Sequence, residues 1–218
     1  MTNTSIQSET ELSSVNSILM AIGQAPISRI YQKETYDNGD VKLVYVNPEI
    51  AFIHSLLMEV NADVQNEGWV FNRESNYPLT PDSNGDIHVP ENILRMDVYQ
   101  NDIYRTTDLV KRDGRLYDKL NHTFYFDPLK SIYFDVVWKW DYEELPSAFK
   151  RYITIRASGR AAAQLITNPS LVQLLATQEA QLRATCMEYE CTQGDHTFFG
   201  TPDNSSYNAY QPYRTLAR

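Results

Sequence analysis

The four histidines, His54, His88, His122 and His196, are the first candidates for catalysis or metal binding. They are scattered along the chain, and no two of them share metal-ligand spacing with a cysteine or a carboxylate. His54 falls on a predicted helix, where a residue at the edge of the core or on the surface is the favoured interpretation over a ligand. The sequence therefore predicts no metal and no cofactor.

Three acids, Asp141, Glu143 and Glu144, could supply the carboxylate pair of a glycosidase. Acids are common at the start of helices, because the positive end of the helix dipole attracts them. A role at the start of a helix is therefore favoured over a catalytic role for these three residues. Arg156 and Arg160 share a helix face and could contact phosphate, although a solvated or salt-bridged face is favoured. The sequence contains no P-loop, GxGxxG or GxSxG motif, so we expect no catalytic residues and no enzymatic activity.

Composition narrows the class of protein further. Cys186 and Cys191 are not in a CxxC motif, which predicts reduced structural thiols. A formal net charge of -9 over 218 residues argues against tight nucleic-acid binding, but it is compatible with DNA that slides past an acidic wall without sticking. The 15 tyrosines fit either a large contact surface or a tyrosine-rich β-sheet, and both stay open.

The sequence has neither a run of about 18 apolar residues nor, within Met1–Thr10, the apolar core of a signal peptide. It therefore predicts no membrane span. We expect a protein that is made and kept in the cytoplasm, or that enters a particle assembled there.

Apolar periodicity predicts two helices in the first third of the chain. Ser8-x-x-Glu11 indicates a capping box that opens a helix over Glu9–Ile22, and Gly23 ends this helix. Asn47-Pro48 starts a second helix, which Gly68 closes.

Two further helices, Leu145–Ile166 and Ser170–Tyr189, are predicted in succession and joined at Asn168-Pro169. The first has apolar stripes over a wide arc, so it is expected to be central. The residues expected to form the core of the helices are Leu12, Leu19, Ile53, Leu57, Phe149, Ile153, Leu175 and Leu182.

The period of two typical of strands replaces the helical period between the second and third helices. Trp69–Asn72 is expected to begin an extended segment, and Leu94–Tyr99 to form a strand. Asp113-Gly114 between Leu109–Arg112 and Arg115–Asp118 predicts a two-residue hairpin. Two aromatic strands are expected to follow, at His122–Asp127 and Ser131–Trp140.

The predicted fold is α+β: a four-helix bundle from both ends of the chain, an inserted small antiparallel β domain and an extended C-terminal tail. Ile27–Val46 is expected to be a loop with some strand at Val41–Val46. The expected domains are 1–68 and 141–191 for the bundle, 69–140 for the β domain and 192–218 for the tail.

The C-terminal tail has no periodicity, yet aromatic residues are spaced through its polar sequence. Disordered tails are usually poor in aromatics. This composition favours a segment that orders against a partner over a frayed end packed on its own domain.

Several short motifs occur in a fixed order: Glu11–Asn16, Ile22–Ser28, Glu67–Asn72, Asp141–Pro146 and Cys186–Glu190. Together they resemble the signature of tail tubular protein A of short-tailed, autographivirus-like bacteriophages. The resemblance covers most of the chain, and it is poor over Tyr77–Leu129 and beyond Gln193.

The resemblance implies a structural virion protein that assembles in the host cytoplasm as part of the tail. Members of that family form a dodecameric ring that adapts the portal to the tail nozzle and offers attachment points to fibres. DNA is expected to pass through the lumen without specific binding. The C-terminal tail is then expected to contact the portal through Phe198, Phe199, Tyr207, Tyr210, Tyr213 and Arg214.

Two alternatives stay open at this point. One is a virion-associated hydrolase of envelope polysaccharide or peptidoglycan, which would need a cleft with paired carboxylates. The other is a cytoplasmic binding module without a role in a phage.

Overall fold

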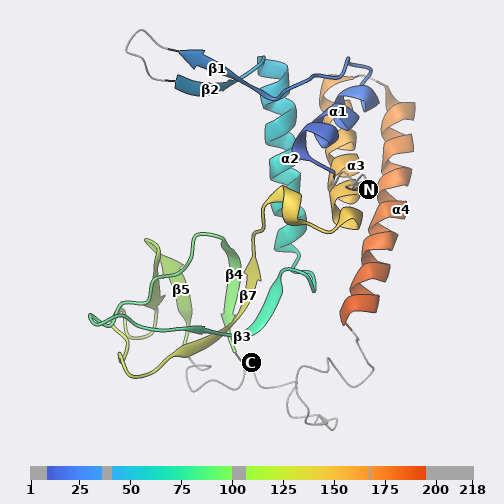
Figure 1. Cartoon of the computed structure of the whole chain (residues 1–218). Coiled ribbons are helices and arrows are strands. Elements are labelled where there is room, and N and C mark those ends of the chain that lie inside the picture. Colours follow the sequence, from blue (N-terminus) through green and yellow to red (C-terminus); the bar gives the residue numbers. More distant parts are fainter. Residues whose placement is uncertain (1–8, 36–40, 100–106, 167, 195–218) are drawn as a thin grey trace, which may run out of the picture. The chain divides into compact units, whose positions relative to one another are not determined.

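The computed structural model describes residues 9–35, 41–99, 107–166 and 168–194 (Figure 1). Over these residues the protein is mixed α/β, with four α-helices and small antiparallel sheets. The chain forms two compact units. The helical unit comprises Met1–Val64 and Asp141–Tyr189, and the β unit comprises Gln65–Trp140 and the chain from Glu190 onward.

Helix α1, Glu11–Ala21, has Thr10 as its N-cap. The Ser13 N–H donates to Thr10 Oγ1 at 3.2 Å, and the Thr10 N–H donates to Ser13 Oγ at 3.0 Å. The predicted capping box Ser8-x-x-Glu11 is therefore wrong. Thr10 offers the same hydroxyl chemistry two residues later, and the helix begins there.

Helix α2, Pro48–Asn66, begins where the sequence predicts it. Asn47 Oδ1 accepts the Ile50 N–H at 2.7 Å, which confirms the predicted cap. Gly23 after α1 and Gly68 after α2 both have left-handed backbones, with φ of +79° and +81°. Glycine adopts this conformation without a steric cost, so both predicted helix ends are confirmed.

Helices α3, Ser147–Leu165, and α4, Pro169–Gly194, follow one another closely. Asn168 Oδ1 accepts the Leu171 N–H at 3.3 Å, which confirms the predicted cap of α4. Helix α4 continues beyond its predicted end at Tyr189.

The acids before α3 lie in a separate 3₁₀ turn, η1, Tyr142–Glu144. The first turn of α3 contains no acid, and Pro146 is its N-cap. The interpretation of these acids as partners of the α3 dipole is therefore wrong. An extended stretch at Leu145 and Pro146 separates them from the helix.

Most of the residues expected to form the core of the helices are buried. Leu19, Ile53, Leu57, Phe149, Ile153 and Leu175 are buried, whereas Leu12 and Leu182 are half-buried.

A buried polar cluster joins α1, η1 and α3. The Tyr142 hydroxyl lies 2.7 Å from Ser14 Oγ and 3.1 Å from Thr154 Oγ1, and it donates to the Lys150 carbonyl at 3.2 Å. Burial raises the pKa of Tyr142, so its hydroxyl stays protonated at neutral pH. Residues from both ends of the sequence thereby meet in one hydrogen-bonded cluster.

We expect Tyr142→Phe to lower the free energy of unfolding by about 1–3 kcal/mol, because Ser14 would keep a buried hydroxyl without its partner. Chemical denaturation followed by circular dichroism measures this change. Tyr125→Phe is the control, since Tyr125 is 62% exposed. Equal stabilities of the two variants would contradict the assigned role of the cluster.

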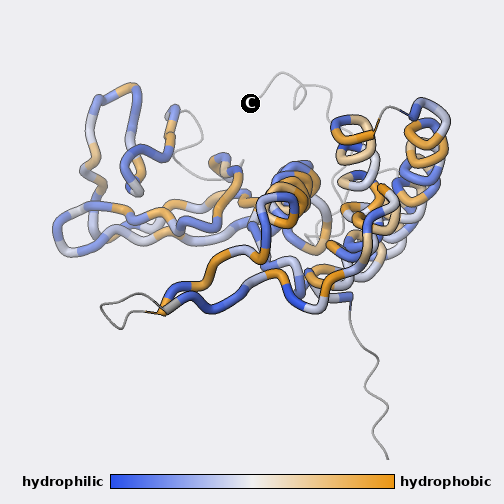
Figure 2. Tube along the Cα trace, turned by 90° about the horizontal axis from the view of Figure 1, so that it is seen from above, coloured by the Kyte–Doolittle hydropathy of each residue, from blue (hydrophilic) through white to orange (hydrophobic). Residues whose placement is uncertain are grey.

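A two-stranded hairpin, β1 Tyr31–Thr35 and β2 Val41–Tyr45, projects from the helical unit (Figure 1). We call it the arm. Strand β2 is confirmed, but β1 lies in a segment predicted to be loop. Its residues are mostly polar, and Figure 2 shows this polar strand beside the more apolar β2. Strand β1 is extended because it pairs with β2. Its own polar sequence does not have the alternation of apolar and polar residues that predicts a strand.

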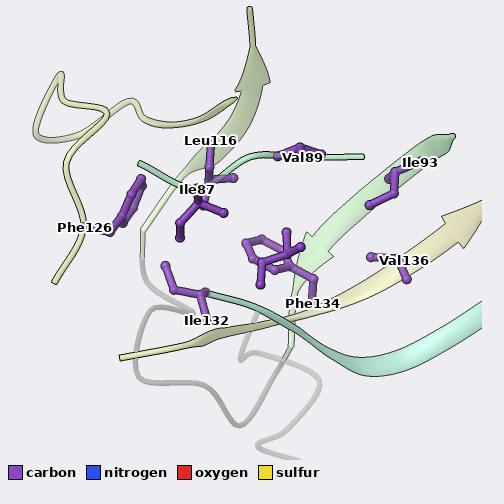
Figure 3. Packing of buried hydrophobic residues seen from close by; sticks show 9 residues of the cluster. Ile87, Val89, Ile93, Leu116, Phe126, Ile132, Phe134 and Val136 are labelled. Atoms are coloured by element: carbon purple, nitrogen blue, oxygen red, sulfur yellow. The ribbon is translucent and has the colours of Figure 1, made fainter. Parts of the chain in front are cut away.

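The β unit contains a sheet of order β3-β7-β4 and a hairpin β5-β6. The strands are β3 Arg73–Leu79, β4 Ile93–Val98, β5 Leu109–Arg112, β6 Arg115–Asp118 and β7 Ile132–Trp138. The hairpin around Asp113-Gly114 is confirmed residue by residue, with both turn residues at positive φ. The core of the β unit consists of apolar side chains that point toward one another, among them Ile87, Leu116, Phe126, Ile132 and Phe134 (Figure 3).

Two predictions in this region are wrong, and one strand was not predicted. Trp69–Asn72 is a turn, in which the Arg73 N–H donates to the Trp69 carbonyl at 2.9 Å. His122–Asp127 is irregular, apart from one bridge between Asp118 and Thr123. Strand β3 went unpredicted, since Pro78 interrupts its pattern, and an edge strand tolerates this proline.

Asn72 holds the Trp69–Asn72 turn in place. Its Oδ1 accepts the Trp69 N–H at 2.9 Å, and its Nδ2 donates to the Gln65 and Trp138 carbonyls at 2.9 and 2.8 Å. The side chain is 1% exposed, so one buried amide links the end of α2, the turn and β7.

Candidate interaction surfaces

The described histidines belong to different parts of the fold. His54 is buried at the root of the arm, His88 and His122 lie on the β unit, and His196 lies outside the described residues. Among residues 9–35, 41–99, 107–166 and 168–194, no group of three or more His, Cys, Asp or Glu could hold a metal ion.

His54 connects three elements of the helical unit. Its Nδ1 lies 3.1 Å from the Tyr45 hydroxyl of β2, and its Nε2 lies 3.3 Å from Glu11 Oε2 of α1. The Tyr31 ring stands edge-on to it with centroids 5.7 Å apart. Burial and the hydrogen bond with Tyr45 raise the pKa of Tyr31 to about 12. His54 is thus a core-edge residue that anchors the arm.

The same face of the arm continues outward from this root. The register pairs Tyr31 with Tyr45 and Lys33 with Leu43, so these four residues share one face. Leu43 is 61% exposed, and Val41 is 60% exposed. The arm therefore has exposed apolar side chains farther along its strands than Tyr31 and Tyr45, which contact His54 of α2.

Arg156 and Arg160 form salt bridges, which confirms the favoured interpretation. Arg160 Nη1 lies 3.1 Å from Glu59 Oε1, and its Nη2 lies 2.8 Å from Asp63 Oδ2, so it joins α3 to α2. Arg156 Nε lies 3.7 Å from Glu179 Oε1 on α4.

The outer surface of α4 is exposed but poor in charge. Among the described exposed positions from Ser170 to Met187, Arg183 is the only charged residue, and it donates to the Tyr152 hydroxyl at 3.0 Å. The other exposed positions include Gln173, Leu174, Ala176, Thr177, Gln178, Ala180, Gln181, Ala184, Thr185 and Met187. Solvent-facing surfaces usually carry charge at about a quarter to a third of positions. This helix surface is therefore typical of one that a partner covers.

A hollow of about 600 Å³ lies on the β unit, lined in part by Arg73, Arg95, Asp97, Asp108 and Asp135. Asp97 and Asp135 stand opposite each other on β4 and β7. A glycosidase acid is normally enclosed by apolar side chains, whereas Asp97 is exposed and arginines share its hollow. The predicted carboxylate candidates, Asp141, Glu143 and Glu144, do not line it.

A cationic and aromatic surface lies on the β5-β6 hairpin. Arg112 stands over the Tyr117 ring, with its Cζ 4.2 Å from the centroid, and Arg115 stands over Phe124 at 4.4 Å. The Tyr117 and Phe124 centroids are 4.8 Å apart. We call these four residues the arginine platform. Sequence reasoning predicted the hairpin, and with it the placement of two arginines beside its turn, but it did not identify the platform.

Both cysteines are free, with Cys186 buried and Cys191 exposed. The predicted portal contacts Phe198, Phe199, Tyr207, Tyr210, Tyr213 and Arg214 lie outside the described residues. No described helix has both the length and the apolar character needed to cross a membrane.

Comparison with known protein families shows the family to which the chain belongs. The family model described as tail tubular protein matches residues 12–196. The chain belongs to the tail tubular protein family. No curated protein matches it.

Membership of the tail tubular family makes the chain a structural component of a bacteriophage tail. The family is structural rather than enzymatic. Several residues of the recognised motifs support the fold: Gly68 ends α2, Trp69 is 4% exposed, and Asn72 clamps its turn.

Proposed function

We propose that the protein is a ring-forming adaptor that joins the portal to the tail nozzle and lines the channel through which DNA leaves. The observation that carries this proposal is the outer surface of α4, which is exposed along the helix and nearly free of charge. Depletion of charged residues is typical of the central part of a protein interface, so this surface suits contact with a neighbouring subunit.

A closed ring requires two unlike surfaces on each subunit, because its contacts run head to tail. The chain offers unlike surfaces in its helical and β units: the charge-poor face of α4, the arm and the arginine platform. In this proposal the four helices work as one four-helix bundle. Twelve copies would close the ring, and a tail fibre is a further candidate partner.

The net charge of -9 supports a passive role toward DNA. Tight binding to DNA uses clustered Lys and Arg to neutralise phosphates. An acidic lumen wall repels the duplex and allows it to slide during ejection. The protein is then assembled into the virion in the host cytoplasm.

Electron microscopy of the full-length protein mixed with purified portal tests the proposal. We expect rings coaxial with the portal and a central opening wide enough for a DNA duplex. Single subunits scattered over the portal, or no complex at micromolar concentration, would overturn the adaptor role.

We expect deletion of residues 195–218 to leave α4 and the fold intact but to abolish attachment to portal-bearing heads. The proposed contact between the tail and the portal is repeated by every subunit of the ring. Deleting the tail removes all of these contacts at once, so the affinity of the ring for the portal should fall steeply. Sedimentation of heads with bound protein measures attachment, and unchanged circular dichroism shows that the truncated protein is folded. A full-length variant with Phe198, Phe199, Tyr207, Tyr210 and Tyr213 replaced by Ser separates the aromatic contacts from the length of the tail. Attachment of both variants at wild-type levels would exclude this role for the tail.

A further inference from the structure

Two arginines stand directly opposite each other across the β5-β6 hairpin. Arg112 pairs with Arg115 in the register, so both side chains lie on one face of the hairpin. Like charges in this position destabilise a strand pair. Arg115 Nη1 lies 3.1 Å from Asp86 Oδ1, whereas Arg112 is exposed and has no ion pair with any described residue. Arg112 is therefore the guanidinium of the platform that is left for an external anion to pair with.

Stacking holds both guanidinium groups in place. Each lies over an aromatic ring, and the two rings contact each other. A stacked guanidinium keeps its N–H edge free, and it loses little side-chain freedom when a carboxylate binds in bidentate fashion. The platform is therefore preorganised for carboxylates.

The η1 turn presents a matching set of acids. Asp141, Glu143 and Glu144 are exposed, and none of them forms an ion pair with a described residue. The turn itself is fixed, since Tyr142 is 1% exposed and Lys150 Nζ donates to the Glu143 carbonyl at 2.7 Å. Three exposed carboxylates thus lie on or beside a fixed turn, and the cation bound to that turn, Lys150, contacts the Glu143 carbonyl rather than a carboxylate.

We propose that the arginine platform of one copy binds the η1 acids of a second copy. The inference rests on the proposed ring, to which it adds one specific subunit contact. The two patches differ, so the contact is head to tail and can be repeated by every subunit. Charge complementarity supports a second copy as the partner, because an unpaired guanidinium and unpaired acids occur on the same chain.

Charge reversal tests this contact. We expect Arg112→Glu to raise the concentration needed for half-maximal ring formation on the portal at least about tenfold at low salt. The double variant Glu143→Arg with Glu144→Arg should weaken assembly similarly. Combining all three substitutions should restore assembly to within about threefold of wild type, because the charges are exchanged. Arg29→Glu reverses an exposed cation outside both patches and should assemble normally.

Folding is controlled within the same experiment. Arg112→Glu places a carboxylate opposite Arg115, so its Tm should not fall below that of wild type. Arg112→Gln is the milder variant and should weaken assembly in the same direction.

Each outcome decides a separate point. If wild type forms rings and the reversed variants assemble equally well, the contact is wrong while the ring stands. If single reversals weaken assembly but the combination does not restore it, the platform faces another partner. If wild type forms no ring with the portal, the adaptor proposal fails and this inference fails with it.

Discussion

Asn72→Asp is expected to lower the free energy of unfolding of the β unit by about 3 kcal/mol or more. The substitution keeps the shape of the side chain but replaces its donor with a second acceptor. That acceptor would face the Gln65 and Trp138 carbonyls, which now accept from Asn72 at 2.9 and 2.8 Å. A carboxylate buried against two carbonyl oxygens has no compensating donor on that side.

Urea denaturation followed by tryptophan fluorescence measures this loss, because all three tryptophans, Trp69, Trp138 and Trp140, belong to the β unit. Asn92→Asp is the matched control, since Asn92 is exposed. Its free energy of unfolding should change by less than about 0.5 kcal/mol. A variant of Asn72 as stable as this control would show that the clamp does not hold the turn.

The helices could be predicted because their signals are local. Asn47 and Asn168 cap the helices that follow them, and Gly23 and Gly68 end the helices before them. The hairpin at Asp113-Gly114 is equally local, because both turn residues must tolerate positive φ.

The strands that were missed depend on their partners. Strand β1 is polar and gains its conformation from β2, and β3 contains Pro78, which an edge position accommodates. The opposite error occurred at His122–Asp127. Its aromatic residues serve other contacts, since Phe126 is buried in the β-unit core and Phe124 lies under Arg115.

The contact surfaces were harder to predict than the fold. A two-residue turn between Arg112 and Arg115 already places them opposite each other, so this part of the platform was readable from the sequence. Its stacking on Phe124 required the path of the irregular segment that follows β6. The charge-poor face of α4 required knowledge of which side of the helix is covered.

Gly85→Ala is expected to lower the free energy of unfolding of the β unit by about 3 kcal/mol, more than Gly114→Ala, for which we expect about 1 kcal/mol. The two glycines have similar backbones, with φ of +82° and +72°. Their surroundings differ. A Cβ added at Gly85 would lie 2.5 Å from the Tyr125 ring and 2.8 Å from the Phe126 carbonyl oxygen, whereas one at Gly114 meets nothing within 4 Å.

The comparison separates backbone strain from steric overlap. In both variants an alanine adopts a left-handed backbone, which costs free energy. At Gly85 the Phe126 N–H also donates to the Gly85 carbonyl at 2.8 Å, and this hydrogen bond limits how far the segments around Gly85 and Phe126 can move apart. Urea denaturation followed by tryptophan fluorescence gives both values under one set of conditions. The double variant Gly85→Ala with Tyr125→Ala removes the ring but keeps the carbonyl contact, so it should recover part of the loss. Equal losses at Gly85 and Gly114 would mean that the Tyr125 ring and the Phe126 backbone yield freely, and that strain alone sets the cost.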